Sequence, residues 1–198
     1  MQNIKVSSVI FVGMILFGVL GYYALRLGFY PIAVVNGAFV GASRFTQTEG
    51  FVKTYYDNAR KVYNLPDLKP GDAQYEREIA RATLDQLVSY ELMKEELEAE
   101  MGNDLGAVVD QKIENTKKAS GSDFAKAVET VYGISVDRFK DTVLVPEARE
   151  EILRGRLFAA KKDFDEWLTG AKKNARVMIL HPDLQWDGGK VVIRERSH

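Results

Sequence analysis

An uncharged apolar run of 20 residues, Val6 to Leu25, opens the pattern of hydrophobic and polar positions along the chain. A helix rises about 1.5 Å per residue, so this run reaches roughly 30 Å, the thickness of a bilayer's hydrocarbon core. Lys5 precedes the run, and a positive charge before a membrane helix favours a cytoplasmic N-terminus. We therefore expect residues 1–27 to form an uncleaved signal anchor that contacts membrane lipid through residues 6–25.

Two alternatives remain open for this run. A cleavable signal peptide requires small residues near its end, and Val19-Leu20-Gly21 matches such a cleavage site only weakly. A buried helix of a globular domain is seldom so uniformly apolar. The anchor and the signal peptide both export the rest of the chain. The sequence thus predicts a single-pass cell-membrane protein with a periplasmic or extracellular body.

Apolar residues at spacings of three and four dominate residues 28–183, which we expect to form one helical domain. Ser43 and Asp163 stand where helix N-caps are expected, and Gly102 stands where a helix ends. Pro146 is expected to kink or restart a helix, because proline lacks the backbone N–H. The predicted helices cover residues 43–64, 72–101, 104–119, 124–132, 135–145, 147–161 and 163–171.

Two short apolar segments flank Asn36-Gly37, a strong sequence signal for a β-hairpin because both residues tolerate positive φ. An isolated hairpin is marginally stable in water. The apolar residues 177–180 follow the last predicted helix, so we expect them to pair with the hairpin. The sequence thus predicts a mainly α fold: a transmembrane helix, then a helical domain with a small β-sheet. Residues 184–198 are expected to be a tail in which 190–195 can form one more strand.

The 198 residues include 27 Lys and Arg against 28 Asp and Glu, a formal net charge of −1. This balance lacks the basic excess typical of nucleic-acid binders, so no nucleic-acid partner is expected. The chain has no cysteine, which excludes disulfides, thiolate metal sites and a cysteine nucleophile. It has only two histidines, His181 and His198, and no recognisable catalytic motif. The sequence therefore predicts no enzyme activity, no catalytic residue, no cofactor and no metal site.

Carboxylates crowd the end of the long helix predicted over residues 72–101, and we interpret them as a solvated acidic face. Trp167 lies on an amphipathic stripe and is interpreted as a core residue. Trp186 lies in a predicted turn region. A role in binding is the alternative to core packing for both tryptophans, and for Trp186 that choice stays open. The carboxylates are Glu91, Glu95, Glu96, Glu98 and Glu100.

Three stretches of the body resemble one family of chaperone domains. Residues 33–37, Ala-Val-Val-Asn-Gly, are similar to an opening strand and turn of the type V-x-V-N-G. Residues 82–93 resemble a helix of the type L-D-x-L-I-x-x-x-L-L, and the run 121–158 is similar in order and spacing. Over about residues 33–180 the chain resembles the N-terminal chaperone domain shared by SurA and the foldases of the PpiD and PrsA types.

The resemblance implies a membrane-anchored extracytoplasmic chaperone, a holdase that binds unfolded or exported polypeptides in an apolar groove. Foldases of this family often insert a parvulin-type prolyl isomerase domain before the closing helix. Here only five residues separate Phe158 from Phe164, and the paired histidines of parvulin sites are absent. The resemblance therefore implies client binding without isomerase activity. The alternative is a structural or adaptor subunit that holds one fixed envelope partner through the same helical domain.

The candidate client-binding residues are apolar and amphipathic side chains of the first two predicted helices of the body. Tyrosine and methionine suit adaptable contacts, because tyrosine is amphipathic and the methionine thioether repacks easily. Packing in the core is the competing interpretation for each of them. The candidates are Phe45, Val52, Tyr55, Tyr56, Tyr63, Tyr90, Met93 and Met101.

Overall fold

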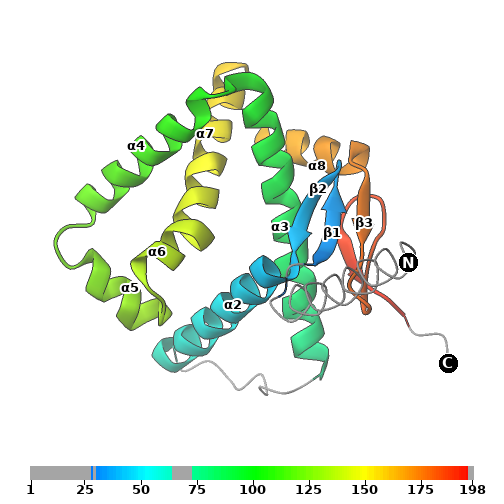
Figure 1. The fold of residues 1–198 in the computed structure, drawn as a ribbon, viewed down its shortest axis with the longest axis horizontal. Helices are drawn as coiled ribbons and strands as arrows, with labels where there is room; N and C mark the ends of the chain where they lie inside the picture. Colours follow the sequence, from blue (N-terminus) through cyan, green and yellow to red (C-terminus); the bar gives the residue numbers. More distant parts are fainter. Residues whose placement is uncertain (1–27, 29, 64–72, 196–198) are drawn as a thin grey trace, which may run out of the picture.

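The computed structural model describes residues 28, 30–63 and 73–195 (Figure 1). The expected membrane anchor lies outside the described residues. Among the residues that are described, no helix is long and apolar enough to cross a membrane. The described part is therefore the body that follows the predicted anchor.

Helices dominate the body, as the apolar spacing predicts, and their bounds agree closely with the predicted ones. The helices are α2 (Ala42–Tyr63), α3 (Ala73–Met101), α4 (Asp104–Ala119), α5 (Phe124–Tyr132), α6 (Val136–Phe139), the π-helix η1 (Lys140–Leu144), α7 (Val145–Ala159) and α8 (Phe164–Asn174). The strands are β1 (Pro31–Val35), β2 (Ala38–Gly41), β3 (Val177–Ile179), β4 (Leu184–Trp186) and β5 (Val191–Ile193).

The predicted sheet is confirmed. Strands β1 and β2 pair antiparallel across the Asn36-Gly37 turn, and β3 pairs antiparallel with β1, which gives the order β2-β1-β3. Asn36 has φ 50° and Gly37 has φ 94°, so both central residues of the turn adopt the positive φ that this kind of hairpin requires. The first strands of the body are thereby joined to its C-terminal part.

Gly37→Val is expected to lower the free energy of unfolding by about 2 kcal/mol, because a β-branched residue is strained at positive φ. An added Cβ at Gly37 meets nothing within 4 Å, so the effect isolates the backbone conformation. Gly41→Val in β2 is the matched control, since Gly41 has no positive φ and is equally free of neighbours. Urea unfolding of both variants measures the difference. Equal stabilities for the two variants would contradict the prediction.

Residues 184–193 correct the expectation of a tail. They form a second hairpin in which β4 and β5 pair antiparallel, and only the second of these strands lies within the predicted 190–195. Leu184 and Val191 are fully buried, at 0% exposure, and pack in the same core cluster as β1. The segment is therefore part of the folded body rather than an appendage.

Helix α3 connects two hydrophobic clusters. Figure 1 shows it running between the sheet on one side and helices α4 to α7 on the other. Leu84 and Leu87, in its first part, pack with the sheet and the β4–β5 hairpin. Met93 and Leu97, near its end, pack with residues of α4 to α8. The side chain of Tyr90 touches both clusters, so one helix couples the two halves of the core.

The predicted break at Pro146 takes another form. Helices α6, η1 and α7 follow one another without an intervening loop. The chain passes the proline through a π-helical turn, in which the N–H of Val145 donates to the carbonyl of Lys140. A π turn accommodates the missing proline donor without ending the helix. Pro146 itself is buried, so this turn belongs to the core.

Candidate functional site

A row of apolar side chains crosses the outer face of the three-stranded sheet. Phe39 of β2, Val34 of β1 and Met178 of β3 are direct cross-strand neighbours. Phe39 is 73% exposed and Met178 is 62% exposed, while Val34 is partly buried between them. Single exposed apolar residues are ordinary, but a contiguous exposed apolar row on a folded body is typical of a binding surface. We call these three residues the sheet row.

The row continues past its β3 end. Leu180 lies two residues beyond Met178, so it points to the same face of the sheet, and it is 48% exposed. Its backbone N–H donates to the carbonyl of Ile32 at 2.8 Å, which holds it beside β1. The exposed apolar surface therefore follows β3 along its length.

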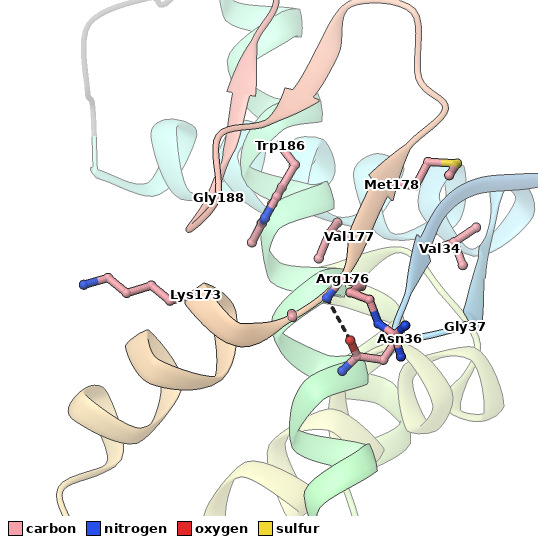
Figure 2. A pocket seen from close by; sticks show the side chains of 10 residues that line it. Val34, Asn36, Gly37, Lys173, Arg176, Val177, Met178, Trp186 and Gly188 are labelled. Atoms are coloured by element: carbon pink, nitrogen blue, oxygen red, sulfur yellow. Dashed lines mark hydrogen bonds between the residues drawn. The ribbon is translucent and has the colours of Figure 1, made fainter.

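A hollow of about 660 Å³ adjoins the sheet row (Figure 2). It lies between the end of α8, strand β3 and the turn of the β4–β5 hairpin. Val34 and Met178 belong to both the row and the hollow, so the two features form one surface. Its other walls include Val177, Trp186, Lys173 and Arg176.

Trp186 forms one wall of the hollow from strand β4. Its indole packs partly against the core cluster of the sheet, and Figure 2 shows it facing the strand that carries Val177. The neighbouring Asp187 accepts backbone hydrogen bonds from Gly189 at 3.0 Å and Lys190 at 2.8 Å. The bond from Lys190, together with that from Gly189, lowers the pKa of the Asp187 carboxyl. This ordered turn fixes the tryptophan's strand.

Asn36 fixes the opposite wall. Its side-chain Oδ1 accepts from the backbone N–H of Arg176 at 2.9 Å, and its Nδ2 donates to Glu95 of α3 at 2.7 Å. Its backbone N–H donates to the carbonyl of Arg176 at 2.9 Å. One turn residue thus joins the hairpin, β3 and α3. The sheet side of the hollow is held in place before any ligand arrives.

Two cations stand beside the hollow. Lys173 extends from the last turn of α8, and Arg176 directly precedes β3 (Figure 2). Neither forms an ion pair within the described part of the chain, whereas the adjacent Lys172 is paired with Asp85 at 2.7 Å. The surface therefore combines an apolar floor with positive charges at its rim.

Among the residues predicted to bind clients, those whose side chains the structure describes are not brought together on one surface. Phe45 and Met93 are buried, at 4% and 2% exposure, so their prediction as surface contacts is wrong and they are core residues. Tyr90, Val52 and Met101 are half-buried. Burial, the largest cause, raises the pKa of Tyr90 to about 12. The side chains of Tyr56 and Tyr63 lie outside the described residues.

Tyr55 is 46% exposed and belongs to an aromatic cluster that joins α2 to α5 and α6. Its ring stacks on Tyr132 at 6.3 Å between centroids, and Phe51 stacks on the same ring at 5.3 Å. Tyr132 also contacts Phe139 at 4.8 Å. These rings join α2 to α5 and α6. For Tyr55 this favours the packing interpretation over client binding.

The predicted solvated acidic face is wrong at one position. Glu91 is 6% exposed and forms ion pairs with Arg44 of α2 and Lys94 of α3. Glu100 pairs with Arg156 of α7. No group of three or more potential ligands in the described residues is arranged to hold a metal ion. Glu91 and Glu100 therefore link α3 to α2 and α7.

Sequence reasoning missed the sheet surface, although a signal was present. Residues 32–35 and 177–180 are apolar at every position instead of alternating with polar residues. Continuous apolar runs are typical of strands that are covered on both faces. Here one face packs on the core and the other carries the sheet row. A strand in a small sheet whose residues do not alternate between apolar and polar thus has a second apolar face. Such a face is a candidate binding surface.

Comparisons with known proteins assign no family to the chain. No family model matches the sequence, and no curated protein and no solved structure gives a significant match. The resemblance to chaperone domains accordingly stays an expectation from the sequence motifs.

Proposed function

We propose that this protein is a chaperone that holds unfolded polypeptides without catalysing a reaction. The observation that carries the proposal is the continuity of the sheet row with the hollow beside Trp186. Apolar burial contributes roughly 25 cal/mol per Å², and because it is non-directional it tolerates many sequences. A preformed apolar surface of this kind suits clients that share hydrophobicity rather than sequence.

The proposal includes a place in the cell. The uncharged run Val6 to Leu25 supports a membrane anchor, with the body on the extracytoplasmic side. Exported chains emerge unfolded at that face of the membrane. An anchored chaperone meets them at a raised effective concentration, which compensates for weak individual contacts.

The location of the proposed surface differs from the helical groove expected from the sequence. Phe45 and Met93 are buried in the two core clusters. Phe39 and Met178 have the highest fractional exposures among the large apolar side chains of the sheet. The client surface proposed here is therefore the sheet row and the hollow, not the faces of α2 and α3.

The test is suppression of aggregation. The purified full chain is added to two unrelated unfolded proteins, and light scattering is followed. We expect suppression at near-stoichiometric amounts. Replacing Phe39→Ser and Met178→Ser together should raise the amount required at least tenfold, since burying each of these side chains contributes roughly 1.5–3 kcal/mol.

The matched control is Phe158→Ser on α7, because Phe158 is 85% exposed but lies outside the sheet row and the hollow. This variant should suppress aggregation as the parent does. If the parent fails to suppress aggregation and instead purifies with one abundant partner, the adaptor function replaces the chaperone. If Phe158→Ser and the sheet variant lose activity equally, the surface is assigned wrongly.

A further inference from the structure

Strand β3 forms an edge of the sheet. The backbone of Arg176 accepts from Asn36 at 2.9 Å, and Leu180 donates to Ile32 at 2.8 Å. In an antiparallel ladder the residues that bond to a neighbour alternate along the strand. The backbone groups of Val177 and Ile179 therefore point away from β1, toward the other side of β3.

That other side has no strand partner among the described residues. Strand β4 lies close to β3, yet it pairs only with β5. The hollow opens between β3 and the β4–β5 turn, and Val177 and Trp186 are both in its walls (Figure 2). The unpaired N–H and C=O of Val177 thus border an open space next to an aromatic wall. An open edge of this kind is a template for an added strand.

The charges beside the hollow add a preference. Lys173 and Arg176 carry no ion pair within the described chain, and Arg176 sits at the start of the open edge. A carboxylate brought to this end of the strand meets an unpartnered guanidinium, which is suited to bidentate contact with planar acidic groups. The apolar floor and the cationic end are thus complementary to one kind of segment.

We propose that the open edge of β3 binds an extended apolar polypeptide segment by strand addition, with an acidic side chain of that segment held by Arg176 and Lys173. The backbone hydrogen bonds give affinity that does not depend on the sequence of the segment. The two cations give a preference for segments that carry an acidic side chain. This proposal rests on the proposed chaperone function and specifies which client segments the surface takes. A polypeptide is favoured over a lipid headgroup, because only a polypeptide supplies the alternating donors and acceptors that the edge leaves unpaired.

The probe is a short peptide, blocked at both ends, in which valine and threonine alternate around a central aspartate. A twin carries lysine in place of the aspartate. A second twin has methylated amide nitrogens along one edge, which removes its strand donors. Binding to the full chain is measured by fluorescence anisotropy of a label on each peptide. We expect the aspartate peptide to bind roughly tenfold tighter than the lysine twin, and the methylated twin to lose measurable binding.

The variant Lys173→Glu with Arg176→Glu should reverse the preference between the aspartate and lysine peptides. The matched control is Lys118→Glu with Lys126→Glu, which makes the same charge change on exposed positions of α4 and α5. Its preference should equal the parent's. Circular dichroism melts verify that both variants are folded.

Three results would overturn the proposal. The aspartate and lysine peptides could bind equally well, or the methylated twin could bind as tightly as the unmethylated peptide. The third is that the full chain binds anionic vesicles through Arg176 but binds none of the peptides. The outcomes separate it from the chaperone function. A parent that suppresses aggregation but ignores peptide charge refutes only the strand-addition site. A parent that binds the peptides as expected but does not suppress aggregation refutes the chaperone function and leaves the site standing.

Discussion

A chain that ends after Lys173 is expected to lose the cooperative unfolding of the whole body. The truncation removes β3 from the edge of β1, together with the β4–β5 hairpin. Leu184 and Val191 are fully buried, and burying each contributes about 2 kcal/mol. Loss of β3 leaves β1 and β2 as an isolated hairpin on α3, which is marginal in water. The side chains of Leu184 and Val191 alone contribute about 4 kcal/mol. That is a large part of the whole stability of a domain, about 5–15 kcal/mol, before the loss of β3 is added.

The loss should extend to the helices that keep all their residues. Helix α3 packs in both clusters, and Tyr90 touches both. Uncovering Leu84 and Leu87 on the sheet side therefore weakens the helix on which α4 and α7 pack. Domains of this size usually unfold as one unit, so a local loss appears as a global one.

Thermal unfolding followed by circular dichroism measures the effect. The control is a chain that ends after Glu195, which keeps every strand of the body. The control should unfold at the same temperature as the parent. The chain ending after Lys173 should show no cooperative transition. If the shorter chain melts within a few degrees of the parent, the C-terminal strands contribute little and the coupling through α3 is wrong.

Much of the helical part of this fold could be predicted because its determinants are local. Asp163 caps α8 by accepting from the backbone N–H groups of Asp165 and Glu166, both at 2.9 Å. Gly133 closes α5 with φ 66°. Asn36-Gly37 forms the turn that its composition predicts. In each case a few adjacent residues determine the backbone, so a single sequence is enough.

The second hairpin could not be predicted in the same way. Strands β4 and β5 have three residues each, too few for a periodic pattern. The position of β5 depends on Asp85, which accepts from the backbone N–H of Val191 across 106 positions of sequence. The π turn before Pro146 is a similar case. A local rule predicts a break there, and buried neighbours keep the helix continuous.

The candidate site was predicted in the wrong place for a related reason. An amphipathic stripe such as that of α2 is equally compatible with a groove and with a core, because both require apolar residues on one face. Burial decides between them, and it placed Phe45 and Met93 in the core. The exposed sheet row depends on strand register, which joins Phe39, Val34 and Met178 from three separate segments.

Asp85→Ala is expected to lower the free energy of unfolding by about 3 kcal/mol. One carboxylate of α3 ties down two C-terminal elements: its Oδ2 accepts from Lys172 of α8 at 2.7 Å and its Oδ1 from the N–H of Val191 in β5 at 2.9 Å. The side chains of Asp85 and Lys172 are 23% and 13% exposed, so water replaces these bonds poorly. Removing the carboxylate leaves both donors without this acceptor.

Asp85→Asn separates the two bonds. The amide oxygen can still accept from Val191, but the ion pair with Lys172 is lost, so we expect an intermediate stability.

Combining Asp85→Ala with Lys172→Ala completes a double-mutant cycle, in which the two losses should be less than additive because they remove one shared contact. Asp110→Ala is the matched control, since Asp110 pairs with Lys140 on the exposed surface and its loss should change stability little.

Urea unfolding of these variants, with Lys172→Ala alone to complete the cycle, decides the outcome. A large loss confined to Asp85→Ala, partly restored in Asp85→Asn, would establish that the carboxylate joins α8 and β5 to α3. Equal and small losses at Asp85 and Asp110 would contradict this arrangement. In that case the β4–β5 hairpin, and with it the Trp186 wall of the hollow, would be held by the apolar contacts of Leu184 and Val191 alone.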